Sequence, residues 1–148
     1  MKKILLITLL FGVQALFAQE DAAIKKCIQT FFDGMYARDT VMIKSVCHKT
    51  MSLQTVIIEA GGNKLSSENR AEFYKMMAEI SKNLIFEERL LDYKIQQDGF
   101  IAQVWTPYEF YVNKKLSHSG NNAFSLMKEN GSWKIIYIID TRKVAVKK

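Results

Sequence analysis

Proline and glycine are scarce in this sequence. One Pro and seven Gly stand among its 148 residues, which leaves no room for a long flexible linker between two folded parts. The chain also has no internal repeat and no low-complexity segment. Its length and its hydrophobic share of 49% are those of one globular domain, and they exclude a disordered chain.

Potential metal ligands are few as well. The two histidines, His48 and His118, lie far apart in the sequence, without the spacing of a metal site. The two cysteines form no Cys-x-x-Cys motif, so neither a zinc site nor a thioredoxin-like redox site is supported. The sequence also lacks a Gly-rich phosphate loop and a nucleophile elbow. It therefore indicates no metal and no cofactor.

Positive charge is in excess but is not concentrated. The formal net charge of +6 falls to +4 if the segment that holds Lys2 and Lys3 is removed. The remaining lysine pairs, at 25–26, 114–115 and 147–148, are isolated and form no stripe. This pattern predicts a soluble protein with a mixed-charge surface and does not support nucleic-acid binding.

The N-terminus has the three parts of a secretory signal. Lys2 and Lys3 form a positive region, an apolar run follows from Ile4 to Val13, and Ala18 offers a small residue at the cleavage position. The run is shorter than the roughly 20 residues that span a bilayer, which disfavours the alternative of a membrane anchor. We therefore predict a signal peptide at 1–18, cleaved after about Ala18, and one domain at 19–148. The mature protein would be secreted or periplasmic, without a membrane partner.

The two cysteines have two possible states in such a compartment. Cys27 and Cys47 lie on the apolar faces of two successive predicted helices. An oxidising environment permits a disulfide between them. On an apolar face each could equally remain a free thiol that packs as a small hydrophobic side chain. The sequence leaves both possibilities open.

Three helices are predicted in the first half of the mature chain. The segment 21–38 has apolar residues at helical spacing over its whole length. Asp39 and Thr40 form an N-cap pair before a short helix from Val41 to Val46 or Cys47. Asn69 and Glu72 form a capping-box variant that opens a third helix, with Phe73, Met76, Met77 and Ile80 on one face. The expected helices therefore precede most of the strands.

Strands dominate the second half of the chain. The predicted strands are 51–58, 84–96, 100–112, 115–127 and 132–142, with turns at 61–63, 98–99 and 130–131. Helices followed by a run of strands indicate an α+β fold. We expect three helices packed on one face of a strongly bent, mostly antiparallel sheet, which together form a cone with a pocket. Pro107 cannot donate to a ladder and should mark a bulge or an edge.

The turn lengths predict the register of these strands. With Asp98 and Gly99 as the turn, Gln97 would face Phe100, and Tyr93 and Ile95 would share a face with Ala102 and Val104. A two-residue turn at Asn130-Gly131 would place Asn122 opposite Ile139 and leave Asp140 on the other face from His118. A bulge in either strand would instead bring Asp140 and His118 to the same face.

Several segments resemble a known superfamily. The segment 28–34 resembles the first helix of the nuclear transport factor 2-like superfamily, also called the SnoaL-like or cystatin-like fold. The segments 104–110, 117–124, 133–136 and 139–142 resemble an exported, mostly bacterial branch often labelled "putative lumazine-binding". Ser119 stands where many relatives carry Cys. The resemblance covers the mature chain and implies the cone-shaped fold; it also implies that the protein is a homodimer, as members often are.

Function must be argued from the site, because this superfamily includes isomerases, cyclases, dehydratases, hydrolases, transport factors and non-catalytic binders. We expect a pocket whose ligand-binding residues are Trp105, Tyr108, Glu109, His118 and Asn122. The candidates for acid–base catalysis are His118, Glu109 and Asp140.

Each candidate catalytic residue also has a structural interpretation. His118 could be a strand residue hydrogen-bonded to a neighbour, Glu109 could pair with Lys114 or Lys115, and Asp140 with Arg142 could close the last strand. The favoured hypothesis is an exported protein that binds a small, partly apolar ligand. The alternatives are a cofactor-free SnoaL-like enzyme and a non-catalytic homodimeric interaction module.

Overall fold

The computed structural model describes residues 2–81 and 83–144, with side chains described within 18–81 and 83–143. Most of the expected signal segment and the lysine pair at 147–148 therefore lie outside the described side chains. The elements in chain order are α1 (Lys2–Ala37), α2 (Thr40–Val46), β1 (Cys47–Glu59), β2 (Gly62–Asn69), α3 (Arg70–Glu79), β3 (Phe86–Leu90), β4 (Lys94–Gln97), β5 (Ile101–Val112), β6 (Lys115–Glu129) and β7 (Ser132–Val144).

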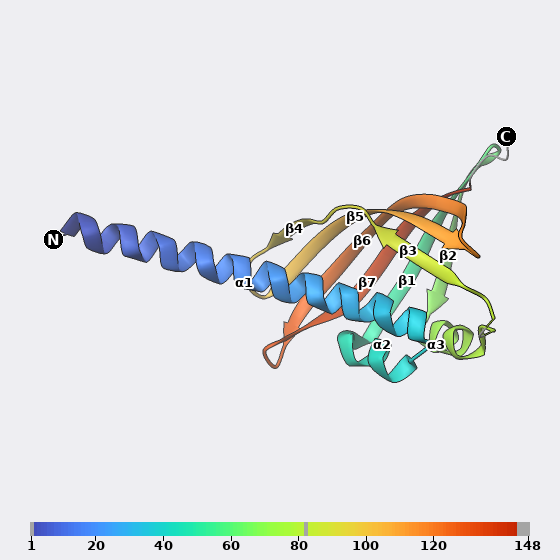
Figure 1. Ribbon diagram of the computed structural model, residues 1–148, viewed down its shortest axis with the longest axis horizontal. Helices are drawn as coiled ribbons and strands as arrows, with labels where there is room; N and C mark the ends of the chain where they lie inside the picture. Colours follow the sequence, from blue (N-terminus) through green and yellow to red (C-terminus); the bar gives the residue numbers. More distant parts are fainter. Residues whose placement is uncertain (1, 82, 145–148) are drawn as a thin grey trace.

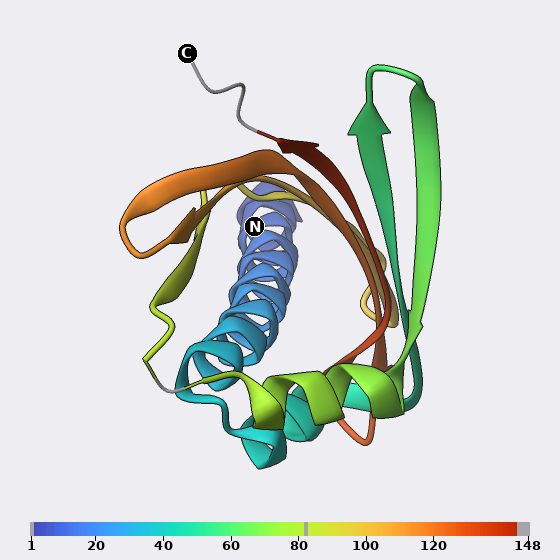
Figure 2. The same cartoon turned by 90° about the vertical axis from the view of Figure 1, so that its right-hand side faces the viewer.

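One curved sheet surrounds the first helix. Its strand order is β2-β1-β7-β6-β5-β3, with β4 also paired to β5. Every neighbouring pair is antiparallel except β1 and β7, which run parallel. Figures 1 and 2 show α1 along the concave side of the sheet and α2 and α3 across one end. The predicted α+β class, with three helices on one face of a bent sheet, is confirmed.

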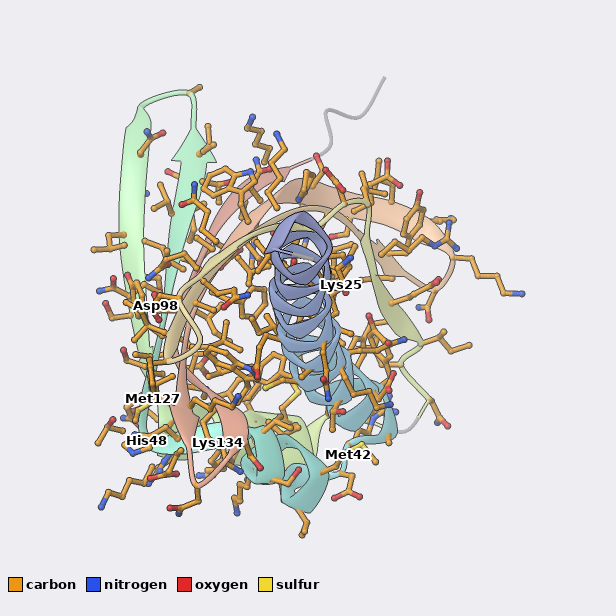
Figure 3. All side chains as sticks on the ribbon, turned by 90° about the vertical axis from the view of Figure 1, so that its left-hand side faces the viewer. Lys25, Met42, His48, Asp98, Met127 and Lys134 are labelled. Atoms are coloured by element: carbon orange, nitrogen blue, oxygen red, sulfur yellow. The ribbon has the colours of Figure 1, made fainter. Side chains whose placement is uncertain are left out.

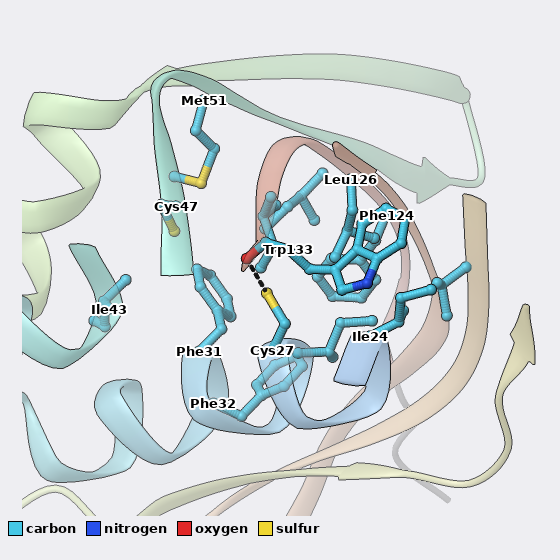
Figure 4. Packing of buried hydrophobic residues seen from close by; sticks show 14 of the residues in the cluster. Ile24, Cys27, Phe31, Phe32, Ile43, Cys47, Met51, Phe124, Leu126 and Trp133 are labelled. Carbon is cyan, nitrogen blue, oxygen red and sulfur yellow. Dashed lines mark hydrogen bonds between the residues drawn. The ribbon is translucent and has the colours of Figure 1, made fainter. Parts of the chain in front are cut away.

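The predicted amphipathic face of α1 forms the centre of the core. Ile24 and Ile28 have no exposed surface, and Phe31 and Phe32 are also buried. These residues recur every three or four positions and so lie on one side of the helix. Figure 3 shows side chains packed between α1 and the concave face of the sheet, and Figure 4 shows this core from close by. None of the helices in the described part of the chain has the length and hydropathy needed to cross a bilayer.

The helix boundaries follow the predicted caps. The side chain of Asp39 accepts hydrogen bonds from the backbone N–H groups of Val41 and Met42 at the start of α2. At α3, Asn69 and Glu72 form the complete capping box. Each cap gives partners to N–H groups that have none inside the helix. On the expected apolar face of α3, Phe73 and Met77 are buried and Met76 is exposed, and Ile80, which directly follows the helix, is half-buried.

Both cysteines are free and buried. The Cys27 thiol donates to the backbone carbonyl of Trp133 at 3.3 Å, which is drawn in Figure 4. Burial raises the pKa of each thiol to about 12. In this structure the two residues therefore pack as small apolar side chains, the second of the two states that the sequence allowed.

Strand β2 was not predicted. Apart from Gly62 and Leu65, the residues of this strand are polar, and almost all of its residues are exposed, so they give no alternation signal. The strand exists because β1 continues into it through a tight turn and pairs with it from Glu59–Gly62 to Ser52–Asn69. Backbone pairing along an edge thus replaces side-chain burial as the cause of the strand.

The predicted strand at 84–96 is two strands, β3 and β4. They are separated at residues 91–93, where the backbone N–H of Leu91 donates to the carbonyl of Pro107 at 2.9 Å. The expected irregularity at Pro107 is therefore confirmed. The register at the next turn is corrected, because Gln97 pairs with Ala102 and not with Phe100. This two-residue shift keeps Ile95 on the predicted face.

The last hairpin has the predicted turn but not the predicted register. Asn130 and Gly131 both have positive φ, and Glu129 pairs with Ser132. Further along, Leu126 pairs with Ile135 and Ser125 with Tyr137, so Ile136 is an extra residue.

Burial explains this bulge in β7. Trp133 and Ile135 are buried at the spacing of a regular strand, and the next buried residue is Ile138. A regular strand would bury Tyr137 in place of Ile138, so the extra residue restores the apolar face. The bulge also places Asp140 opposite Asn122, on the concave face, which corrects the expected register.

Candidate functional site

An open cavity of about 680 Å³ lies between the helices and the concave face of the sheet. Figure 2 looks toward the space that α1, α3 and the sheet enclose. Most of its wall is aromatic or aliphatic: Phe31, Phe32, Met35, Leu53, Ile57, Phe73, Met76, Met77, Ile80, Leu84, Phe86, Phe110, Val112, Phe124 and Ile138 contribute. A cavity of this size and lining is typical of a small-molecule site.

Polar groups converge on the strand wall of this cavity. Glu88 of β3, Tyr108 of β5, His118 and Asn122 of β6, and Asp140 of β7 all line it. They come from adjacent strands and point to the concave face, because inward residues of paired strands lie side by side. Three of the five predicted ligand-binding residues, Tyr108, His118 and Asn122, are thus brought together, along with Asp140.

Glu88 is the most perturbed carboxyl group in the cavity. Asn122 Nδ2 donates to Glu88 Oε1 at 2.7 Å. Burial raises the pKa of Glu88 to about 7, and the neighbouring Asp140 also raises it, while the Asn122 hydrogen bond lowers it. The Tyr36 hydroxyl of α1 holds the backbone of Glu88 through its N–H, at 3.0 Å, and its carbonyl. The carboxyl is therefore fixed in place and takes up a proton more readily than an exposed glutamate does.

Asp140 is held by donors from two other strands. Thr55 Oγ1 donates to Oδ1 at 2.5 Å, and the Tyr108 hydroxyl donates to Oδ2 at 3.0 Å. The guanidinium of Arg142 lies 3.8 Å from Oδ2, which confirms the expected ion pair at the end of β7. Burial and Asp140 raise the pKa of Tyr108, so its hydroxyl stays protonated and remains a donor.

Gly120 makes room for Tyr108. A Cβ at Gly120 would lie 1.7 Å from the carbonyl oxygen of Thr141 and 3.0 Å from Cε1 of Tyr108. That carbonyl also accepts a hydrogen bond from the Tyr108 hydroxyl at 3.1 Å. Glycine is therefore required here for the close approach of β6, β7 and the tyrosine ring.

His118 is packed between aromatic rings. It stacks on Phe110 with ring centroids 4.7 Å apart and meets Tyr108 edge-on at 5.9 Å. Burial lowers the pKa of His118 to about 4, and Arg142 lowers it further while Asp140 opposes the shift. Its Nδ1 lies 3.1 Å from the Ser117 hydroxyl, and no hydrogen bond joins His118 to Asp140 within the described residues. The imidazole is thus neutral at physiological pH.

Trp105 and Glu109 lie on the other face of the sheet, which corrects the prediction that they line the pocket. Along β5 the buried residues are Ala102, Val104, Thr106 and Tyr108, so the odd-numbered residues between them point outward. Trp105 is 46% exposed. Glu109 accepts a hydrogen bond from the Tyr111 hydroxyl at 2.7 Å. Because side chains alternate along a strand, Trp105 and Tyr108 cannot lie on the same face of the sheet.

Glu88 is not among the residues predicted from the sequence. Phe86 and Leu90 flank it at two-residue spacing and are half-buried, whereas Glu87 and Arg89 are exposed. A carboxylate on the apolar face of an alternating segment was the available signal. Among the described residues no group of three or more His, Cys, Asp and Glu side chains is placed to hold a metal ion. The cavity instead offers hydrogen-bond donors, acceptors and two carboxyl groups in different environments.

The fold and this cavity define a class of protein, the cone-shaped α+β domains with one open pocket. Within that class, residues 19–138 match the model of a family described as "Putative lumazine-binding". The chain therefore belongs to this family, and its fold is that of the nuclear transport factor 2-like, or cystatin-like, superfamily. No curated protein matches the chain.

Solved structures share this fold at low sequence identity. A protein of unknown function from Mycobacterium tuberculosis has a TM-score of 0.72 at 14% identity, over 90% of this chain and 77% of its own. A nuclear transport factor 2-like protein of unknown function from Shewanella baltica has a TM-score of 0.64 at 15% identity, over 87% of this chain and 98% of its own. A "putative dehydratase" of that superfamily from Streptomyces avermitilis has a TM-score of 0.65 at 15% identity, over 86% of this chain and 99% of its own.

Proposed function

We propose that this protein binds a small, partly apolar ligand in the cavity between α1, α3 and the sheet. The observation that carries the proposal is the Glu88–Asn122 pair, joined at 2.7 Å on the wall of an otherwise apolar cavity of about 680 Å³. Apolar walls supply most of the binding free energy in such sites, and a few fixed polar groups orient the ligand.

The family description supports a heterocyclic ligand. Lumazine, for which the family is named, is a flat bicycle whose edge alternates N–H donors and carbonyl acceptors. A carboxyl and an amide side by side, as in Glu88 and Asn122, present acceptors and donors to such an edge. Phe31 and Phe73, stacked with ring centroids 5.7 Å apart, supply apolar surface in the same cavity. Lumazine is therefore a suitable uncharged probe for hydrogen bonding to the Glu88–Asn122 pair.

Native mass spectrometry of the protein purified after export tests this proposal. We expect a bound small molecule, or a 1:1 complex when lumazine is added. Asn122→Ala should weaken the complex at least tenfold, because the polar orienting group is lost. Asn121→Ala is the matched control, since Asn121 is the adjacent residue on the opposite face of β6. Equal loss in both variants, or an empty protein that takes up no small molecule, would overturn the proposal.

Acid–base catalysis is the second candidate function, and one observation favours it. The pKa of Glu88 is raised to about 7 beside Asp140 in the same cavity, and a carboxyl poised near neutrality can both give and take a proton. A bound ligand that changes in mass or isomeric form with the wild-type protein, but not with Glu88→Gln, would support this candidate. A ligand that stays unchanged over many hours with both proteins would count against it.

We also propose that the chain is exported and cleaved after Ala18. The residues just after that position contact the sheet: Glu20 accepts a hydrogen bond from Trp133 Nε1 at 2.8 Å and pairs with Lys128, and Asp21 accepts one from Gln97. Cleavage after Ala18 would keep these contacts. The intact mass of the protein expressed with its own N-terminus should correspond to a chain that begins at Gln19. A full-length mass in the exported fraction would contradict this.

A further inference from the structure

The charged side chains of the cavity wall are mostly acidic, although the chain as a whole is basic. Four carboxyl groups line the cavity, from Glu68, Glu72, Glu88 and Asp140. Among the described lining residues Arg142 is the only Lys or Arg. The formal net charge of the whole chain is +6. The sign of the charge inside the cavity is therefore opposite to that of the protein.

The carboxyl groups also act on one another. Asp140 contributes to the raised pKa of Glu88, and Glu72 contributes to the raised pKa of Glu68. Asp140 has its own donors, in Thr55, Tyr108 and Arg142. Glu88 is less well satisfied: Oε1 accepts from Asn122, and no described side chain donates to Oε2. Glu88 Oε2 is thus an acceptor on the cavity wall that a donor on a ligand can reach.

We propose that the ligand of this cavity is a cation, an apolar body that carries a protonated amine whose N–H donates to Glu88 Oε2. This inference deepens the proposed function and rests on it. A positive ligand group would relieve the repulsion between Glu88 and Asp140 and supply the missing donor. The aromatic rings that line the cavity, including Phe31, Phe73 and Phe110, add favourable contacts to a cationic ligand.

A matched set of three probes tests the sign of the charge. 1-Naphthylmethylamine, 1-naphthalenemethanol and 1-naphthoate share one aromatic body and are positive, neutral and negative at pH 8. Titration calorimetry should give the amine an affinity at least tenfold higher than the alcohol, and the acid the weakest binding. The positive net charge of the protein would favour binding of the negative naphthoate, so the predicted order of affinities cannot arise from net charge.

The pH dependence gives a second readout. The titratable and charged side chains that line the cavity with Glu88 are His118 of β6, Asp140 and Arg142 of β7, Tyr108 of β5, Glu68 of β2 and Glu72 of α3. Asn122 of β6 donates to the Glu88 carboxylate, and Tyr36 of α1 contacts the Glu88 backbone. The pKa of His118 is lowered to about 4, and burial raises those of Tyr36 and Tyr108. Glu88, with a pKa of about 7, is therefore the group of this set that changes charge between pH 6 and pH 8. Its ionised fraction rises from about a tenth to about nine tenths, so the affinity for the amine should rise by up to about tenfold over this range.

The variants separate Glu88 from general effects of charge. Glu88→Gln should abolish both the preference for the amine and its rise with pH. Glu87→Gln removes the same charge from the adjacent, outward-facing residue and should leave both unchanged. Equal binding of the three probes would overturn the cationic class while leaving the cavity a binding site. The cationic class would also be overturned by tighter binding of naphthoate, by no binding of any probe, or by a preference for the amine that survives Glu88→Gln. Native mass spectrometry tests the proposed function separately.

Discussion

At the scale of single residues, the site depends on how Glu88 and Asp140 are held differently. Both carboxyl groups lie on the concave face of the sheet, on β3 and β7, with β5 and β6 between them. Asp140 receives two hydroxyl donors and pairs with the Arg142 guanidinium, whereas Glu88 receives one amide donor. Burial is the main cause that raises the pKa of Glu88 to about 7, and the Asn122 hydrogen bond and Arg142 only partly oppose it.

This raised pKa predicts how stability changes with pH. A carboxyl whose pKa is higher in the folded state binds more protons than in the unfolded state between the two values, so its contribution to stability falls as the pH rises from about 4.5 to about 7. Urea unfolding from pH 5 to pH 8 should show wild type losing about 1 to 3 kcal/mol relative to Glu88→Gln. The control Glu87→Gln should keep the wild-type profile over this range. A constant difference between wild type and Glu88→Gln would contradict the assigned environment.

Gly120 offers a steric test of the same wall. Gly120→Ala would place a methyl group 1.7 Å from the Thr141 carbonyl oxygen. The strands must then separate and Tyr108 must move, so we expect the free energy of unfolding to fall by about 2 to 4 kcal/mol. Gly61→Ala is the control, because a Cβ there meets no atom within 4 Å. Equal stability of the two variants in thermal unfolding would show that β6 and β7 do not approach as closely as described.

At the scale of elements, the parts that could be predicted from the sequence are those with a strong local signal. The face of α1, the two helix caps and the Asn130-Gly131 turn are all encoded by neighbouring residues, and all are confirmed. Strand β2 has no such signal, because its polar residues form a strand only through pairing with β1. Local patterns cannot reveal a strand whose own residues show no alternation and whose formation depends on backbone pairing with another strand.

The site was predicted only in part for a related reason. Tyr108, His118 and Asn122 are predicted because aromatic and polar residues concentrate on these strands, and the predicted register places His118 and Asn122 on one face. Asp140 was assigned to the wrong face because the bulge at Ile136 is decided by tertiary packing of Ile135 and Ile138. Trp105 and Glu109 were included despite their parity, although alternation alone argued against them. Glu88 was overlooked although Phe86 and Leu90 marked its face as apolar.

The contact of α1 with β1 and β7 predicts the state of the cysteines. Cys27 donates to Trp133 and Cys47 is buried beside α1, both as free thiols. Denaturation without reductant should therefore allow two alkylations per chain, and the native protein should react slowly, because burial keeps the thiols protonated and covered. No alkylation after denaturation would indicate a disulfide and contradict this packing.

At the scale of the whole molecule, the convex face of the sheet remains uncovered by the helices. Trp105 of β5, Ala123 of β6 and Ile139 of β7 lie side by side on it. Trp105 is 46% exposed, and a large exposed aromatic residue in an apolar strip is typical of an interface. We propose that two copies of the chain pair through this face.

Sedimentation of wild type and variants tests this pairing. Wild type should sediment as a dimer at high micromolar concentration, and Trp105→Lys should weaken the dimer about tenfold or more. Val41→Lys, which alters an exposed apolar residue of α2 away from the sheet, should have no effect. Monomeric wild type at that concentration would contradict the proposal without affecting the cavity.

If the cavity between α1, α3 and the sheet holds a small ligand against Glu88, a crystal structure should reveal it. We would determine this structure for the exported protein as isolated and again with an excess of the tightest-binding probe. We expect density for a small molecule between the aromatic wall and the Glu88–Asn122 pair, with a hydrogen bond to Glu88 Oε2. Probe density outside the cavity, or a cavity closed by its own side chains, would contradict it.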